Sequence, residues 1–180
     1  MNHGDHCNLL RPGIPAAGGT WGDFGAGSGA FTLALADLLG ASASIIAIDQ
    51  QASALRENEQ ALRRQFSAVS THYIVADFTH PLELPPLDGL IMANSLHFHS
   101  HKEPILRQIM SYLKPGGQFI LVEYNADTGN QWVPYPLSYP TWIKLAESVG
   151  LIGTHQLATY PSRFLREIYS AGSQRPEPLD

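Results

Sequence analysis

Short apolar runs alternate with segments of helical periodicity from Thr20 onward, a pattern typical of a parallel α/β sheet. The apolar runs have the length of strands, whereas the segments between them place apolar residues on one helical stripe. In the first such segment Phe31, Leu35 and Leu38 share a stripe, and Gly40 stands where a helix would end. The pattern predicts strands at 20–24, 44–48, 73–76, 87–93, 118–124, 157–160 and 164–169, and helices at 30–39, 51–66, 101–113 and 141–149.

Both ends of the chain and one internal segment lack this pattern. Residues 1–19 are rich in glycine and proline without a sustained period, which predicts an irregular arm, and the polar residues 173–180 predict a flexible tail. Residues 125–140 predict a long loop whose aromatic content favours a functional role over disorder. The last two predicted strands flank a proline, so we expect a closing hairpin, and residues 20–172 are expected to form one domain.

Composition narrows the class of protein. With 180 residues, 44% hydrophobic and 15% charged, the chain can bury the core of one ordinary domain. The net charge of -5 provides no general basic face, so stable nucleic-acid binding is not expected. Cys7 is the only cysteine, which excludes an internal disulfide and any site built from several thiolates.

Location and metal content are also expectations from the sequence. The first ten residues are polar, unlike a signal peptide, and no apolar window approaches the roughly 18 residues of a membrane span. We therefore expect a soluble, cytoplasmic protein without a membrane partner. His3, His6 and Cys7 are interpreted as ordinary polar residues near the chain start, and no metal site is predicted.

The most informative stretch is a glycine loop at 25, 27 and 29, which joins a predicted strand to a predicted helix. Glycine permits the turn and lets a ligand approach the backbone, and a helix N-terminus attracts anionic groups. Asp49 ends the next strand, where a carboxylate can accept hydrogen bonds from both hydroxyls of a ribose. The loop also satisfies the dinucleotide pattern, so an NAD-dependent oxidoreductase stays open at this point.

Five landmarks in order resemble the class I S-adenosylmethionine (SAM)-dependent methyltransferases. They are the acid and glycines at 23–29, Asp49, the acid and apolar pair at 76–78, the apolar strand and its continuation at 87–97, and the Leu-Lys-Pro-Gly-Gly turn at 113–117. Each motif alone is weak, but their order and spacing match over roughly residues 20–124. The chain also looks like a group of small bacterial proteins similar to methyltransferase type 11.

This resemblance implies a fold, a cofactor and a set of residues. The fold is a Rossmann-like, doubly wound α/β sheet of seven strands, mostly parallel with an antiparallel last strand. The cofactor is SAM, with S-adenosylhomocysteine as product. The glycine loop would hold its methionine part, Asp49 its ribose, and Asp77 and Phe78 its adenine. The implied cofactor-binding set is Asp23, Gly25, Ala26, Gly27, Gly29, Asp49, Gln50, Asp77, Phe78, Asn94 and Ser95.

The acceptor side is less defined. A sulfonium already activates the methyl group, so in-line transfer to a small-molecule acceptor depends mainly on proximity and orientation. His97 is the candidate base, and Tyr124, Trp132 and Tyr135 are candidates to line the acceptor, although aromatic side chains also fill gaps in ordinary packing. A non-catalytic SAM-binding module is a further alternative to the NAD-dependent enzyme, and the sequence leaves the oligomeric state open.

Overall fold

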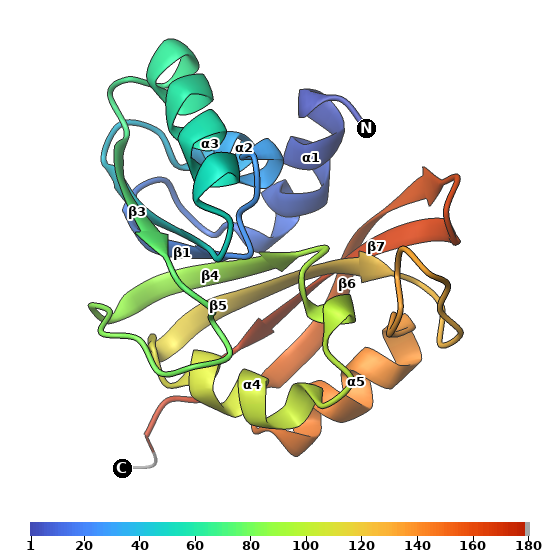
Figure 1. Ribbon diagram of the computed structural model, residues 1–180. Helices are drawn as coiled ribbons and strands as arrows, with labels where there is room; N and C mark the ends of the chain where they lie inside the picture. The colour runs from blue at the N-terminus through green and yellow to red at the C-terminus, as the bar shows by residue number, and fades with distance from the viewer. Residues whose placement is uncertain (179–180) are drawn as a thin grey trace.

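The computed structural model describes residues 1–178 and contains one seven-stranded sheet in the order β3-β2-β1-β4-β5-β7-β6 (Figure 1). The first five strands are parallel, and β7 runs antiparallel to both of its neighbours. This confirms the predicted fold class. The strands are β1 (Gly19–Phe24), β2 (Ala43–Asp49), β3 (Ser70–Val75), β4 (Leu87–Ala93), β5 (Leu113–Tyr124), β6 (Ile152–Ser162) and β7 (Arg166–Gln174).

Helices cover both faces of the sheet. In Figure 1, α1 (His3–Leu10), α2 (Ala30–Leu39) and α3 (Ala52–Gln65) lie on one side, and α4 (Lys102–Met110) and α5 (Tyr139–Ser148) lie on the other. A hydrophobic core lies on each face of the sheet, and β4 contributes to both. Leu90 and Met92 pack on the α4 side, while Ile91 and Ala93 pack on the α2 side. A strand buried on both faces needs an unbroken apolar run, which is what residues 90–93 provide.

The strand order creates a topological switch point between β1 and β4, at the carboxyl ends of the parallel strands. Strand β1 pairs with β2 on one side and with β4 on the other, so the connections diverge at its carboxyl end. The backbone N–H groups of Gly25 and Ala26 donate to the carbonyl of Ile48 at 2.8 and 3.0 Å, which fixes the glycine loop beside the end of β2. Ligands of open α/β sheets bind at such a point.

The prediction of an irregular arm over 1–19 was wrong. Residues His3–Leu10 form α1, and a short 3₁₀ turn covers Arg11–Gly13. Asn2 and Asp5 form a capping box, in which each side chain accepts a hydrogen bond from the backbone N–H of the other residue. The helix also buries Leu9 and Leu10, so tertiary packing outweighs the glycine and proline content on which the prediction rested.

The predicted flexible tail is also partly wrong. Ser173 is a buried residue of β7, and the next residues stay attached to the sheet, because the N–H of Gly116 donates to Arg175 and the N–H of Arg175 donates to Gly117. Residues 179 and 180 of that predicted tail lie outside the described residues. The closing hairpin is confirmed as β6 and β7, which are both longer than predicted.

Two further points concern the loop and the helices. The predicted loop at 125–140 ends earlier, because Ser138 caps α5 by accepting a hydrogen bond from the N–H of Thr141. None of the helices within residues 1–178 has both the length and the apolar character required to cross a membrane.

Candidate cofactor site and its surroundings

The three glycines of the glycine loop share a backbone conformation but differ in their surroundings. Gly25, Gly27 and Gly29 all adopt positive φ angles, of 83°, 53° and 99°. A Cβ on Gly25 would lie 2.4 Å from the Cβ of Ser95, and one on Gly29 would lie 2.6 Å from the Cγ of Asn58. A Cβ on Gly27 would meet nothing within 4 Å. Gly25 and Gly29 therefore permit close packing, whereas Gly27 borders open space.

Asp49 stands against this loop at the carboxyl end of β2. Its Oδ2 accepts a hydrogen bond of 2.8 Å from the N–H of Gly27, and its Oδ1 accepts one of 2.8 Å from the N–H of Gln51. These two bonds hold the carboxylate between the loop and the start of α3. The side chain is partly exposed, so it is oriented by backbone groups and remains within reach of a ligand.

Two hollows meet at the glycine loop, and together they gather every residue of the predicted cofactor-binding set. The first has a volume of about 310 Å³, and the second, on the side of α1, has a volume of about 250 Å³. Both are bordered by Gly25, Gly27 and Asn94. The other predicted residues divide into Asp49, Gln50, Asp77, Phe78 and Ser95 in the first hollow and Asp23, Ala26 and Gly29 in the second.

Asn94 lies at the meeting point and carries two marks of a ligand site. It has a φ of 53°, which is uncommon for a residue other than glycine. Its buried Oδ1 finds no hydrogen-bond partner within residues 1–178, although its backbone N–H donates to Val122 at 2.9 Å. Asparagine adopts this φ more readily than most residues, so the unpaired acceptor is the stronger mark, because a buried polar atom costs free energy unless a ligand or water satisfies it.

Asp23 is almost fully buried beneath the loop, with 1% of its surface exposed. Its Oδ2 accepts a hydrogen bond of 2.6 Å from the hydroxyl of Thr32, and that hydroxyl accepts one from the amide of Asn58. Burial raises the pKa of Asp23 to about 7, the bond from Thr32 acts in the opposite direction, and the charge of Asp49 adds to the rise. A nearby cation would therefore be needed to keep this carboxylate fully ionised at neutral pH.

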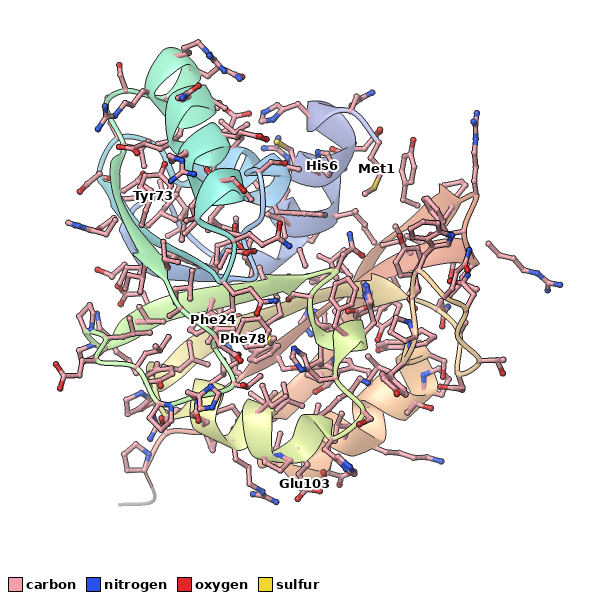
Figure 2. All side chains as sticks on the ribbon, in the orientation of Figure 1. Met1, His6, Phe24, Tyr73, Phe78 and Glu103 are labelled. Carbon is pink, nitrogen blue, oxygen red and sulfur yellow. The ribbon has the colours of Figure 1, made fainter. Side chains whose placement is uncertain are left out.

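Asp77 and Phe78 close the far side of the first hollow. Hydrogen bonds from the hydroxyl and the N–H of Thr79 hold the pKa of Asp77 below its usual value. Phe78 is buried, and its ring meets Phe24 edge-on at 6.4 Å, so the two side chains lie together beneath β4 (Figure 2). This pairing provides an ordered apolar wall beside an ionised carboxylate.

His97 is held by Glu123, a residue near the end of β5 that was not among the predicted site residues. Its Nδ1 lies 2.9 Å from Oε2 of Glu123, and its backbone N–H donates to Oε1 of the same residue at 3.0 Å. Both side chains are buried, at 4% and 0% exposure. Their positions in the sequence were the available signal, because His97 follows β4, Glu123 lies near the end of β5, and these two strands pair in parallel. His97 itself lies outside the residues that border the first hollow, whereas Phe98 and His99 border it.

The three aromatic residues predicted to line the acceptor lie in different surroundings. Tyr124 is buried, and its ring meets His97 edge-on at 5.6 Å. Trp132 and Tyr135 are 66% and 48% exposed, and neither borders the two hollows. Their loop is nevertheless attached to the site, because the N–H of Tyr135 donates to the carbonyl of His97 at 2.9 Å.

The sheet order, the antiparallel β7 and the glycine loop after β1 are those of class I SAM-dependent methyltransferases. Residues 17–159 match the family model described as a methyltransferase domain, and the chain belongs to this family. SAM is the cofactor of this class of enzymes, in agreement with the predicted cofactor.

Curated relatives are similar over part of their length. The ubiquinone/menaquinone biosynthesis C-methyltransferase UbiE of Pseudomonas savastanoi pv. phaseolicola is 28% identical over 108 residues, which are 59% of this chain and 42% of that protein. UbiE of Pasteurella multocida is 30% identical over 105 residues, which are 57% of this chain and 39% of that protein. The chain thus spans about two-fifths of the length of these relatives.

Solved structures share the fold at low sequence identity. The YcgJ protein of Bacillus subtilis has a TM-score of 0.76 at 13% identity and covers 98% of this chain and 100% of its own. The arsenic(III) SAM methyltransferase CrArsM of Chlamydomonas reinhardtii has a TM-score of 0.72 at 19% identity, with 92% of this chain and 66% of its own covered. These likenesses bear on the fold.

Proposed function

We propose that this chain transfers a methyl group from SAM to a small-molecule acceptor. The observation that carries the proposal is the junction of the two hollows. There Gly27 leaves room that any side chain would fill, and Asn94 offers a buried amide oxygen without a partner among the described residues. Both features suit a ligand that passes from one hollow into the other across the glycine loop.

The residues around this junction fit the parts of SAM. Asp49 would accept hydrogen bonds from the ribose hydroxyls, and Phe78 would pack against the adenine, with Asp77 beside it. On the α1 side, Asp23 would face the amino group, whose positive charge would keep that buried carboxylate ionised. Bound SAM supplies a methyl group on a sulfonium, which needs no further activation.

On the acceptor side, the proposal assigns His97 as the base and Glu123 as its positioning residue. In this proposal Nδ1–H of His97 donates a hydrogen bond to the Glu123 carboxylate, which leaves the lone pair on Nε2 to take a proton from the acceptor. The same carboxylate accepts a hydrogen bond from the backbone N–H of Tyr124, so one buried group contacts both the base and the main chain of the adjacent aromatic residue. Fixed orientation of a base is what proximity catalysis requires.

The acceptor we propose is an aromatic small molecule. The UbiE relatives are named as C-methyltransferases of ubiquinone and menaquinone biosynthesis, and the surroundings of His97 support an acceptor of related chemistry. The rings of Phe98 and Tyr124 lie 4.3 and 5.6 Å from that of His97, and Phe164 meets Tyr124 edge-on. Aromatic side chains of this kind stack on planar acceptors.

Calorimetric titration with SAM, S-adenosylhomocysteine and NAD tests the cofactor first. We expect micromolar binding of the first two and none of NAD. Binding of NAD alone would favour the oxidoreductase and overturn the proposal. A subsequent screen of phenolic and quinol acceptors would follow release of S-adenosylhomocysteine. If SAM bound tightly but no acceptor supported turnover, the chain would instead be a SAM-binding module.

Glu123→Gln tests the acceptor side separately. We expect turnover to fall by about 10- to 100-fold and its pH profile to change, because the base loses its orienting charge, while SAM affinity stays within about twofold. Glu103→Gln is the matched control, since Glu103 forms an exposed pair with Arg107 on α4 and borders neither hollow (Figure 2). Equal turnover in both variants and in wild type would remove the charge of Glu123 from the reaction, and unchanged turnover in His97→Ala would remove His97.

A further inference from the structure

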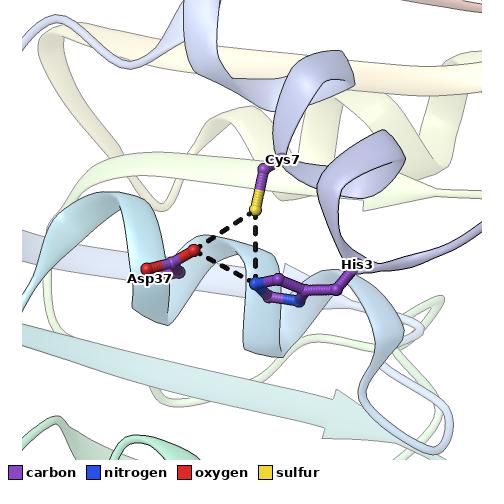
Figure 3. A group of neighbouring side chains, drawn as sticks. All are labelled: His3, Cys7 and Asp37. Carbon is purple, nitrogen blue, oxygen red and sulfur yellow. Dashed lines mark hydrogen bonds and ion pairs between the residues drawn. The ribbon is translucent and has the colours of Figure 1, made fainter.

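Three side chains of types that can bind a metal ion converge where α1 packs against α2. His3 and Cys7 lie one turn apart on α1, and Asp37 faces them from α2 (Figure 3). His3 Nε2 lies 3.1 Å from Asp37 Oδ2, while Cys7 Sγ lies 3.4 Å from that nitrogen and 3.6 Å from that oxygen. Within residues 1–178 this is the one group of three such side chains with ligand atoms this close together.

The triangle has the size of one face of a zinc tetrahedron. Zinc lies about 2.3 Å from sulfur and about 2.0–2.1 Å from nitrogen or oxygen, so tetrahedral angles separate sulfur from either atom by about 3.5 Å and nitrogen from oxygen by about 3.3 Å. The observed separations of 3.4, 3.6 and 3.1 Å differ from these by a few tenths of an ångström at most. An ion would therefore require almost no movement of either helix.

We propose that His3 Nε2, Cys7 Sγ and Asp37 Oδ2 bind one Zn²⁺ ion, with solvent in the fourth position. Cys7 is 3% exposed, whereas the side chains of His3 and Asp37 are 41% and 46% exposed, so the ion is reached from the side of the two polar ligands. Imidazole and thiolate favour zinc over magnesium and calcium, which take oxygen ligands. On binding, the Cys7 thiol releases its proton to solvent as the sulfur–zinc bond forms.

Such an ion would link α1 to α2 and thereby hold α1 in place. This has a consequence for the rest of the molecule, because Met1 and His6 of that region border the second hollow beside the glycine loop (Figure 2). The ligands themselves lie outside both hollows, and the proposal does not depend on methyl transfer. A metal that binds the folded chain also raises its thermal stability.

The experiment adds Co²⁺ alone, and then Zn²⁺, to the metal-free full chain purified without a histidine tag. We expect one equivalent of Co²⁺ to give the visible bands of a tetrahedral ion and a thiolate charge-transfer band, both lost when Zn²⁺ displaces it. Zn²⁺ should also raise the melting temperature. Asp37→Asn, an exposed change, should weaken binding by on the order of 100-fold, as loss of a ligand costs at least what loss of a supporting group does.

Cys7→Ser should abolish the charge-transfer band, and His101→Gln, an exposed histidine outside the cluster, should bind as wild type does. Melting curves recorded without metal would show whether each variant folds. The proposal fails if Co²⁺ gives an octahedral spectrum without thiolate bands, or if Asp37→Asn and His101→Gln bind equally well. The three side chains would then be hydrogen-bonded to one another and nothing more.

Discussion

Two parts of the site are built by different means. The glycine-loop side, residues 23–30 with Asp49, is held by backbone hydrogen bonds, such as those from Gly25 and Ala26 to Ile48 and from Gly27 to Asp49. The His97 side, which comprises His97, Glu123, Tyr124 and the loop at 125–138, instead depends on one buried carboxylate that orients an imidazole. The glycine-loop side is therefore formed by the main chain, whereas the His97 side is formed by a contact between two side chains.

This difference bears on how each side tolerates change. A binding loop formed by the backbone is disrupted by added side-chain atoms, because its glycines either pack closely against neighbours or border the open space of the hollows. A pair of buried side chains is disrupted when the charge of one partner is removed, because the other partner then stays buried without its hydrogen bonds. On the glycine-loop side, substitutions that add bulk should therefore weaken cofactor binding most, while on the His97 side substitutions that alter charge should lower turnover. The following predictions test that division.

The largest effect is expected from Gly27→Val. The new side chain would project into the open space where the two hollows meet, at a φ of 53° that valine adopts poorly. We expect SAM binding to become undetectable by calorimetry, a loss of at least about 1,000-fold, or about 4 kcal/mol.

Gly153→Val is the matched control, because Gly153 has a φ of 64° and open space around it but lies in the β6 region, away from both hollows. It should lose folding stability comparably and keep its SAM affinity. If both variants lost binding together, backbone strain rather than occlusion of the site would be responsible, and the placement of SAM across Gly27 would be wrong.

The next effect concerns the pH dependence of stability without SAM. Asp23 has a folded pKa of about 7 against 3.8 as the ordinary value, so between about pH 4 and 7 the unfolded chain releases this proton first. Stability should therefore fall as pH rises through that range and level off above it, by about 4 kcal/mol relative to Asp23→Asn. Urea denaturation of both proteins from pH 4 to 8 measures the difference, and parallel curves would contradict the raised pKa.

A smaller effect is expected when one carboxylate of the glycine-loop side is removed. Asp49→Ala should weaken SAM binding by about 1–3 kcal/mol, since hydrogen bonds to a charged group are lost. Asp88→Ala is a suitable control because Asp88 also accepts a backbone hydrogen bond, from Thr20, but at the opposite end of the strands. Wild-type affinity in a folded Asp49→Ala protein, measured by calorimetry, would refute the role of Asp49.

The glycine-loop side could be predicted from the sequence because its determinants are local. Positive φ angles require glycine at 25, 27 and 29, and the carboxylate of Asp49 follows from the end of a recognisable strand. The strand pattern also predicted the sheet, since an apolar run buried on both faces admits few alternatives. The assignment of individual residues to SAM stays a prediction.

The His97 side and α1 could not be predicted in the same way. His97 and Glu123 are separated by a helix and a turn, and only the pairing of β4 with β5 brings them together. Helix α1 is short, and its stability comes from burying Leu9 and Leu10 against elements distant in sequence. Both features depend on tertiary contacts that no local period encodes.

The smallest effect should come from the exposed loop of the His97 side. Because Trp132 is 66% exposed, Trp132→Ala should change the free energy of unfolding by no more than about 0.5 kcal/mol and leave SAM affinity unchanged. If the loop contacts the acceptor, as the sequence predicts, KM for the acceptor should rise by roughly threefold to tenfold while kcat changes little, because uniform binding is lost. Ile152→Ala, a change at another exposed apolar residue, in β6, should leave KM unchanged. Identical KM values in the two variants would make Trp132 an ordinary surface residue, and the acceptor contacts of the His97 side would then lie with the buried ring of Tyr124 instead.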